Sequence, residues 1–276
     1  MSVVNVVHPA FEIMKSDLDI YDNYLILERI IRTCYRSEGN ITELSHKKMI
    51  EKIMQFDHTA MIEHLFITVK LYVDRGITHE VVRHRLCSFA QSSTRYIDYS
   101  TGLNVVKPAH ISMVDIEEIC DVSMKDYPYF ISQVSEENKM RVEEAFLFLN
   151  SCRTSFLNYL ARINNGATRS QARGSLCHHT QAELVVTANL REWLHIFKLR
   201  DSKEAHQDFR LPIAGLRNLF AQKYPILFNS SQIHPILFKK TFSYGEKYLV
   251  VPEEEGLQIE SGQYKNHKET VTIPVN

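Results

Sequence analysis

The sequence has no excess of basic residues, and that absence limits what the protein can bind. Its 276 residues carry 32 lysines and arginines against 33 acidic residues, which leaves a formal net charge of -1. Proteins that bind nucleic acids without regard to sequence neutralise many phosphates and need a surplus of positive charge. The sequence therefore predicts no nucleic-acid partner, and its local arginine clusters must serve a small anion.

Closely spaced cysteines and long apolar runs are also missing. The five cysteines stand singly, at positions 34, 87, 120, 152 and 177, so neither a disulfide framework nor a cysteine zinc site is indicated. No apolar run approaches the length that crosses a membrane, and the N-terminus lacks the pattern of a signal peptide. We therefore expect a cytoplasmic protein with no membrane partner, placed in the host cytosol if the gene is viral.

What the chain does contain is the patterning of one large globular unit. Hydrophobic residues make up 44% of it, which is enough for a sizeable core, and no internal repeat or long linker divides it. Alternation from Leu65 to Asp74 predicts a half-buried strand, and the Val- and Thr-rich stretch from Gln181 to Ala188 predicts another. Helical spacing is longest from Glu136 to Ile163, and the Asn-Asn-Gly at 164–166 is typical of a helix end.

Two short polar residues predict where helices begin. Thr78 is expected to cap a short helix that presents Arg83 and His84 near its C-terminal end. Asn189 is expected to cap a helix that runs from Leu190 to Leu199. The sequence therefore predicts basic side chains close to two helix termini.

The segment from Arg83 to Tyr96 is the part of the sequence most suited to binding an anion. This short segment holds three arginines, one histidine and a run of hydroxyl side chains. Guanidinium groups offer several fixed donors to phosphate oxygens, and serine and threonine add hydroxyl and backbone donors. From the pattern alone, a helix end with solvated arginines is an equally good interpretation.

The order of residues in this segment resembles a family signature. Arg83-His84-Arg85, then seven residues, then Ser93, with Arg95-Tyr96 following, is similar to the signature of the flavin-dependent thymidylate synthases. The resemblance covers two blocks, roughly residues 58–99 and 170–224, and is weak elsewhere. It implies reductive methylation of dUMP to dTMP through FAD, with methylenetetrahydrofolate and NADPH as co-substrates and without a cysteine nucleophile.

The resemblance also implies a fold and an assembly. It points to an α+β fold in which an antiparallel sheet is flanked by helices. Residues 1–228 would form a single catalytic domain, and residues 229–276 a peripheral C-terminal extension packed on it. The family assembles as a homotetramer with active sites shared between subunits.

The family's ligand contacts map onto this chain residue by residue. The resemblance assigns these residues to the flavin: His58, Ala60, Arg83, His84, Arg85, Gln91, Asn189, Leu190, Arg191 and His195. It assigns these to dUMP: Glu80, Val81, Val82, Arg83, Gln91, Ser92, Ser93, Thr94, Arg95, Arg173 and Arg200. Arg200 falls where the family has its arginine against the uracil, so the resemblance gives it the catalytic role.

The residues by themselves leave simpler interpretations open. Arg173 is also explained as a solvated helix residue, and Arg200 as a cation near a helix C-terminus. Ser93 resembles a nucleophile, but surrounding arginines favour a serine that donates to a bound anion. No metal is expected, because the histidine separations do not fit a helical metal site and no cysteines join them.

Two other functional classes remain alternatives. A non-catalytic sensor would keep the flavin and nucleotide pocket without turnover. An RNA-binding protein would use the segment from Arg83 to Tyr96 as a basic and aromatic patch. No G-x-G-x-x-G follows any predicted strand, so a Rossmann cofactor domain is unsupported and the arginine and histidine set would have to hold the flavin.

Overall fold

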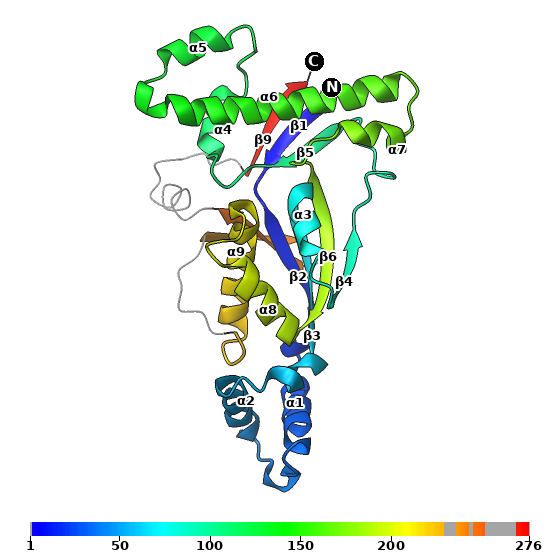
Figure 1. The fold of residues 1–276 in the computed structure, drawn as a ribbon, viewed down its shortest axis with the longest axis vertical. Helices are drawn as coiled ribbons and strands as arrows, with labels where there is room; N and C mark the ends of the chain where they lie inside the picture. The colour runs from blue at the N-terminus through cyan, green and yellow to red at the C-terminus, as the bar shows by residue number, and fades with distance from the viewer. Residues whose placement is uncertain (1, 229–235, 243–244, 252–268, 276) are drawn as a thin grey trace.

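The protein is an elongated α+β molecule built around two sheets. The structure, a computed structural model, describes residues 2–228, 236–242, 245–251 and 269–275. Within these residues the strands form a six-stranded sheet in the order β4-β6-β3-β2-β8-β7 and a three-stranded sheet in the order β5-β1-β9. In Figure 1 the larger sheet occupies the middle of the molecule and the smaller one lies beneath the long helix at the top.

The six-stranded sheet is antiparallel throughout and carries the predicted strands. Its members are β2 Ala10–Ser16, β3 Phe66–Asp74, β4 Cys87–Gln91, β6 Gln181–Asn189, β7 Ile236–Phe242 and β8 Gly245–Val251. Strand β3 alternates as expected, with Ile67, Val69 and Leu71 buried on one face. It pairs along its whole length with β6, from Phe66 opposite Asn189 to Asp74 opposite Gln181. The ends of β3 and β6 therefore fix the starts of the helices that follow them.

Helices pack against the larger sheet to form the first hydrophobic core, and some of them extend beyond the sheet. They are α1 Tyr21–Thr33, α2 Ser45–Gln55, α3 Arg75–Val81, α8 Leu190–Arg200 and α9 Gln207–Lys223, with short 3-10 turns η1 Asp17–Asp19, η2 Glu38–Asn40 and η3 Thr59–His64. Trp193 of α8 is fully buried in this core, and its indole nitrogen donates to the carbonyl of Ile67, 3.0 Å away. Helices α1 and α2 project at the bottom of Figure 1.

A second core lies between the three-stranded sheet and the longest helix. Its elements are β1 Ser2–Val7, β5 Gly102–Val106, β9 Thr270–Val275, α4 Met113–Ile119, α5 Tyr127–Gln133, α6 Glu136–Asn164, α7 Arg169–Ala172 and η4 Arg173–Ser175. Strand β1 is parallel to β5 and antiparallel to β9. Phe156 and Tyr159 of α6 are fully buried here. The predicted α+β class, with antiparallel sheet and flanking helices, is confirmed, and β1 with β5 is its one parallel pair among the described strands.

The C-terminal residues join both sheets at an edge. Strands β7 and β8 extend the larger sheet beyond β2, and β9 pairs with β1 from Ser2 opposite Val275 to Val7 opposite Thr270. The described part of the predicted extension therefore packs by strand pairing. Its boundary at residue 228 stays a prediction. Among the described residues, the structure contains no helix whose length and apolar character would suit a bilayer.

The cap predicted for the short third helix is wrong. Asp74, the last residue of β3, caps α3, and its carboxylate accepts from the backbone N–H of Ile77 at 2.8 Å. Thr78 lies inside the helix and donates to the carbonyl of Arg75 instead. Both residue types suit an N-cap, and strand pairing through Asp74 decides between them, because the helix begins where the strand ends.

Candidate active site

The Arg-His-Arg motif lies in the turn that leaves α3. The N–H of Arg83 donates to the carbonyl of Glu80 at 3.3 Å, and that of His84 donates to Val81 at 3.1 Å. This turn exposes Arg83 and Arg85 and points His84 inward, where it is buried. The motif therefore serves two surfaces, with cations on the outside and an imidazole on the inside.

The N-terminus of α8 is held by the cap predicted for it. The Asn189 side chain accepts from the N–H of Glu192 at 2.8 Å, which satisfies one of the donors that a helix start leaves free. Arg191 and His195 are exposed on this helix. The Arg191 guanidinium lies 2.5 Å from the carboxylate of Glu63 in η3 and so connects the helix to the turn before β3.

Arg200, at the far end of α8, is fixed by two groups from the α3 region. Its Nη1 donates to the Glu80 carboxylate at 3.0 Å, and its Nη2 lies 3.4 Å from the Glu80 carbonyl oxygen. Its Nε donates to Nε2 of His84 at 3.0 Å, and the guanidinium lies 5.0 Å from the centre of the Phe209 ring. Arg200, Glu80, His84 and Glu192 are called the Arg200 cluster below.

His84 acts in this cluster as a neutral hydrogen-bond acceptor. Burial, followed by the nearby Arg200 and His195, lowers the pKa of His84 to about 4. Because Nε2 accepts from Arg200, the ring proton of the neutral form sits on Nδ1, which lies 3.4 Å from the Glu192 carboxylate. Glu192 therefore favours the tautomer that lets His84 orient Arg200.

The contacts of Arg200 leave part of its guanidinium free for a ligand. A guanidinium has five N–H donors in a planar fork, and the three contacts described above use one from each nitrogen. The side chain is 23% exposed. Two donors therefore remain on a cation that is already held in one orientation.

The serine loop after β4 is anchored to β6. Ser92 exchanges two hydrogen bonds with the backbone of Glu183, at 2.9 and 3.0 Å. Gln91 donates to the Thr78 hydroxyl at 2.9 Å, and the Ser93 hydroxyl accepts from the N–H of Arg95 at 3.3 Å. The loop is thus positioned by the sheet on one side and by α3 on the other.

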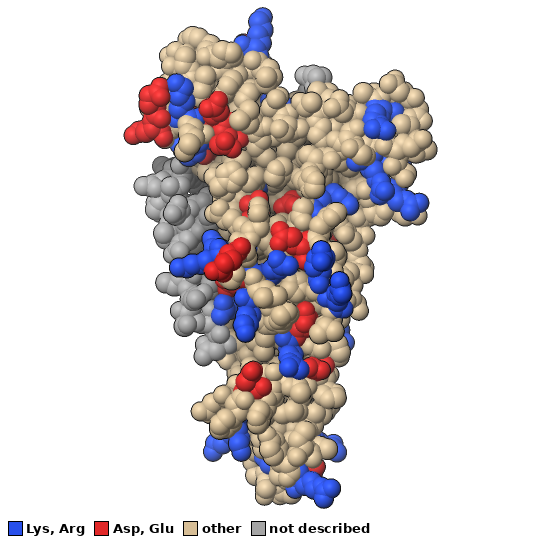
Figure 2. Space-filling model, in the orientation of Figure 1, with Lys and Arg blue, Asp and Glu red and all other residues tan. Residues whose placement is uncertain are grey.

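Four predicted arginines are exposed and make no ion pair within the described chain: Arg83, Arg85, Arg95 and Arg173. By contrast, Arg169 is paired with Asp98 at 2.8 Å and donates to the Tyr96 carbonyl. On the face of the molecule that Figure 2 shows, basic side chains are interspersed with acidic ones over the middle and form no continuous basic surface. Exposed guanidinium groups without ion pairs suit a small anion with several oxygens.

Comparison with known proteins identifies the family of this site. The sequence model of the family described as "Thymidylate synthase complementing protein" matches residues 20–226. The chain belongs to this family. It is 30% identical to the flavin-dependent thymidylate synthase of Corynebacterium aurimucosum over 207 residues, covering 73% of this chain and 77% of that protein. It is 28% identical to the one from Mycobacterium sp. (strain JLS) over 213 residues, covering 74% and 78%.

Solved structures show the same fold. The chain matches a UMP/dUMP methylase, PolB from Streptomyces cacaoi bound with 5-Br dUMP, with a TM-score of 0.59 and 19% identity over 81% of this chain and 94% of that one. It also matches the flavin-dependent thymidylate synthase ThyX from Helicobacter pylori complexed with FAD and dUMP, with a TM-score of 0.54 and 17% identity over 79% and 97%. The resemblance to the flavin-dependent thymidylate synthase family is therefore confirmed.

Two of the predicted flavin residues, His58 and Ala60, lie at the start of η3. His58 precedes η3, where its Nδ1 lies 3.2 Å from the Tyr35 hydroxyl. Ala60 lines an apolar cavity of about 420 Å³ together with Met61 and Ile30. Among the described residues His58 forms no hydrogen bond or ring contact with the Arg200 cluster. Its assignment to the flavin of a neighbouring subunit stays a prediction.

Among the described residues, the structure brings together one group of possible metal ligands that residue spacing did not reveal. His84, Glu192 and His195 each offer a ligand atom, and these atoms lie within 4.8 Å of one another. His84 and His195 come from different elements, so the spacing argument against a metal did not apply to them. The Nε2 lone pair of His84 already accepts from the Arg200 cation, which opposes a second cation at that atom. The absence of a metal stays a prediction.

Sequence reasoning missed Glu192 and Phe209, which complete the surroundings of His84 and Arg200. Glu192 occupies the first turn of α8, where an acidic residue is already explained by the helix dipole. Phe209 appears as one more core aromatic of α9. Neither position carries a local signal for its role, because the partners lie in a distant segment.

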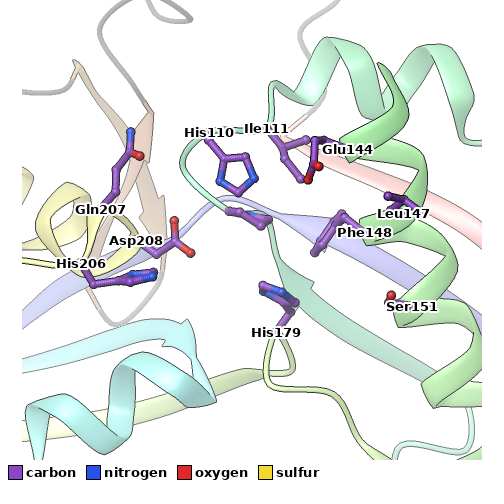
Figure 3. A pocket seen from close by; sticks show the side chains of 11 residues that line it. His110, Ile111, Glu144, Leu147, Phe148, Ser151, His179, His206, Gln207 and Asp208 are labelled. Carbon is purple, nitrogen blue, oxygen red and sulfur yellow. The ribbon is translucent and has the colours of Figure 1, made fainter. Parts of the chain in front are cut away.

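A second cavity is separate from all of the predicted site residues. It has a volume of about 460 Å³ and lies between the loop after β5, helix α6 and the start of α9. Figure 3 shows His110, His179, His206 and Asp208 turned toward the same space. Asp208 accepts from the backbone N–H of Ala109 at 2.7 Å, and His179 packs edge-on against Phe148. These contacts give Asp208 and His179 structural roles.

Proposed function

We propose that this chain is an FAD-dependent thymidylate synthase. It methylates dUMP to dTMP, with methylenetetrahydrofolate as the one-carbon donor and NADPH as the reductant. It works in the cytoplasm as a homotetramer whose active sites are shared between subunits. Family membership supports the reaction, and the arrangement of Arg200 between Glu80 and His84 is the observation that carries it.

The proposed dUMP site is formed by the serine loop and nearby arginines. Arg95 and Arg173 are exposed and unpaired within the described chain, which suits them to a dianionic phosphate. Ser93 adds a hydroxyl, and Ser92 holds the loop on β6. The relatives PolB and ThyX were solved with 5-Br dUMP and dUMP, respectively, which supports the same class of substrate here.

Arg200 acts on the pyrimidine. Glu80 and His84 hold the guanidinium so that two of its N–H groups remain for a ligand. A fixed cation beside the uracil stabilises negative charge that develops on the ring as its C5 carbon becomes nucleophilic. Because the cation is held in place before substrate binds, little reorganisation is needed when that charge appears.

The residues present fit a flavin. Arg83 and Arg85 are exposed cations without ion pairs in the described chain, Arg191 lies in the first turn of α8 beside its Asn189 cap, and His195 is exposed further along the same helix. Such donors suit the diphosphate and the polar edge of FAD. When bound, FAD carries reducing equivalents from NADPH to complete the methyl group. His58 and Ala60 would approach it from a neighbouring subunit.

The decisive experiment measures dTMP formation by the purified full-length chain. The complete mixture contains FAD, NADPH, methylenetetrahydrofolate and dUMP, and each component is omitted in turn. Arg200→Ala is compared with Lys198→Ala, which removes an exposed cation from the same helix. We expect dTMP only in the complete mixture and a loss of activity only in the Arg200 variant.

Other outcomes identify the alternatives. Yellow protein that binds FAD and dUMP but forms no dTMP would indicate a sensor. Colourless protein that cannot be reconstituted with FAD, and whose RNA affinity falls steeply with salt, would indicate an RNA-binding protein.

A further inference from the structure

Two of the five cysteines face each other in the second hydrophobic core. Cys152 lies on α6 and is fully buried, whereas Cys177 lies between η4 and β6 and is partly buried. Their sulfur atoms are 3.9 Å apart. Both thiols are free. The fold brings them together across 25 residues of sequence.

The surroundings give the two thiols different reactivity. The hydrogen bond between the two thiols, together with the Thr180 hydroxyl and the nearby His179, outweighs burial and lowers the pKa of Cys177 to about 6. The same pairing, together with burial, raises the pKa of Cys152. We assign the thiolate to Cys177 because its sulfur lies 3.9 Å from the Thr180 hydroxyl and the residue is partly exposed, whereas Cys152 is fully buried in the second hydrophobic core. Cys177 is thus the better nucleophile toward an oxidant, and Cys152 is the thiol beside it.

We propose that Cys152 and Cys177 form a redox-active thiol pair that peroxides oxidise to a disulfide. The Cys177 thiolate attacks a peroxide oxygen, so that an S–O bond forms, the O–O bond breaks and hydroxide leaves. Cys152 then attacks the sulfenic sulfur, so that the S–S bond forms and water leaves with the Cys152 proton. The two sulfurs lose two electrons in total, and the peroxide gains them.

The geometry requires a modest closure. The sulfur atoms must approach from 3.9 Å to the bonding distance of about 2.05 Å. Cys177 lies in a connecting segment, which can shift more easily than the buried helix that carries Cys152. The bond would tie α6 to the segment that follows η4. The proposed oxidation of the two thiols does not depend on the proposed thymidylate synthase reaction.

The test is oxidation of the full-length protein with hydrogen peroxide, followed by blocking of free thiols and peptide mapping. We expect a peptide pair joined through Cys152 and Cys177, with the loss of two hydrogen atoms in the intact mass and complete reversal by dithiothreitol. Cys177→Ser should prevent the link, and Cys152→Ser should leave Cys177 trapped as a sulfenic acid that a dimedone probe captures.

Cys34→Ser is the matched control, because Cys34 is exposed but has no second cysteine beside it. This variant should form the link as the unaltered protein does. Recovery of both thiols unmodified, or oxidation of Cys177 to sulfinic acid while Cys152 stays free, would overturn the proposal. Mapping the unaltered protein decides the matter even if a serine variant fails to fold.

Discussion

Acid pH should destabilise this protein through His84. The side chain is 3% exposed, and its Nε2 accepts a hydrogen bond from the Arg200 guanidinium. Protonation would place a second N–H against that donor and bury a charge beside a cation. The pKa of His84 is accordingly lowered from its usual 6.5 to about 4 in the folded chain.

The sign and size of the effect follow from this difference. The unfolded chain binds a proton at His84 near pH 6.5 and the folded chain only near pH 4, so the unfolded state takes up more protons as the pH falls. The stability contributed by neutral His84 is complete above pH 6.5 and is lost progressively as the pH falls to about 4. At pH 5 the loss relative to pH 8 is about 2 kcal/mol, because one pKa unit corresponds to about 1.4 kcal/mol.

Urea denaturation at several pH values between 8 and 5 tests this reasoning. His84→Gln keeps an acceptor for Arg200 but cannot titrate, so its stability should fall less than that of the unaltered protein, by about 2 kcal/mol at pH 5. His79→Gln, an exposed histidine of α3, is the control and should behave like the unaltered protein. Protein concentration is held constant, because assembly affects apparent stability. Parallel loss of stability in the unaltered protein and in His84→Gln would refute the lowered pKa.

Three further predictions concern the proposed reaction. Arg200→Ala should slow methyl transfer, measured by rapid mixing with pre-reduced flavin, more than it weakens dUMP binding, and Arg200→Lys should recover only part of the rate because an ammonium cannot reproduce the planar fork of donors. Normal turnover of Arg200→Ala at saturating dUMP would leave Arg200 a binding role only. Arg95→Ala and Arg173→Ala should each weaken dUMP about tenfold and deoxyuridine much less in calorimetric titrations, because a charge-assisted contact contributes about 1.5 kcal/mol at an exposed site; unchanged discrimination between the two ligands would show that these arginines do not read the phosphate. Cys87→Ser should keep dTMP formation, because burial and Glu192 raise the pKa of that thiol to about 12; an inactive variant that still binds FAD and dUMP would point to a cysteine mechanism.

Local sequence patterns predicted a strand, a helix cap and the family of this protein. Alternation in the segment that became β3 predicted which of its side chains are buried, because a strand presents successive residues to opposite faces. Asn189 was recognisable as a cap because its short side chain reaches a backbone N–H three residues on. The order of residues from Arg83 to Tyr96 was enough to predict the family.

Only the tertiary structure decided how the site is built. The contact of Arg200 with Glu80 spans 120 residues of sequence, and that with His84 spans 116. No local periodicity records such a contact, because it depends on β3 and β6 pairing side by side and aligning the helices that follow them. The same pairing made Asp74 the cap in place of Thr78. It also placed Glu192 against His84, and burial there keeps the imidazole neutral so that it can hold Arg200.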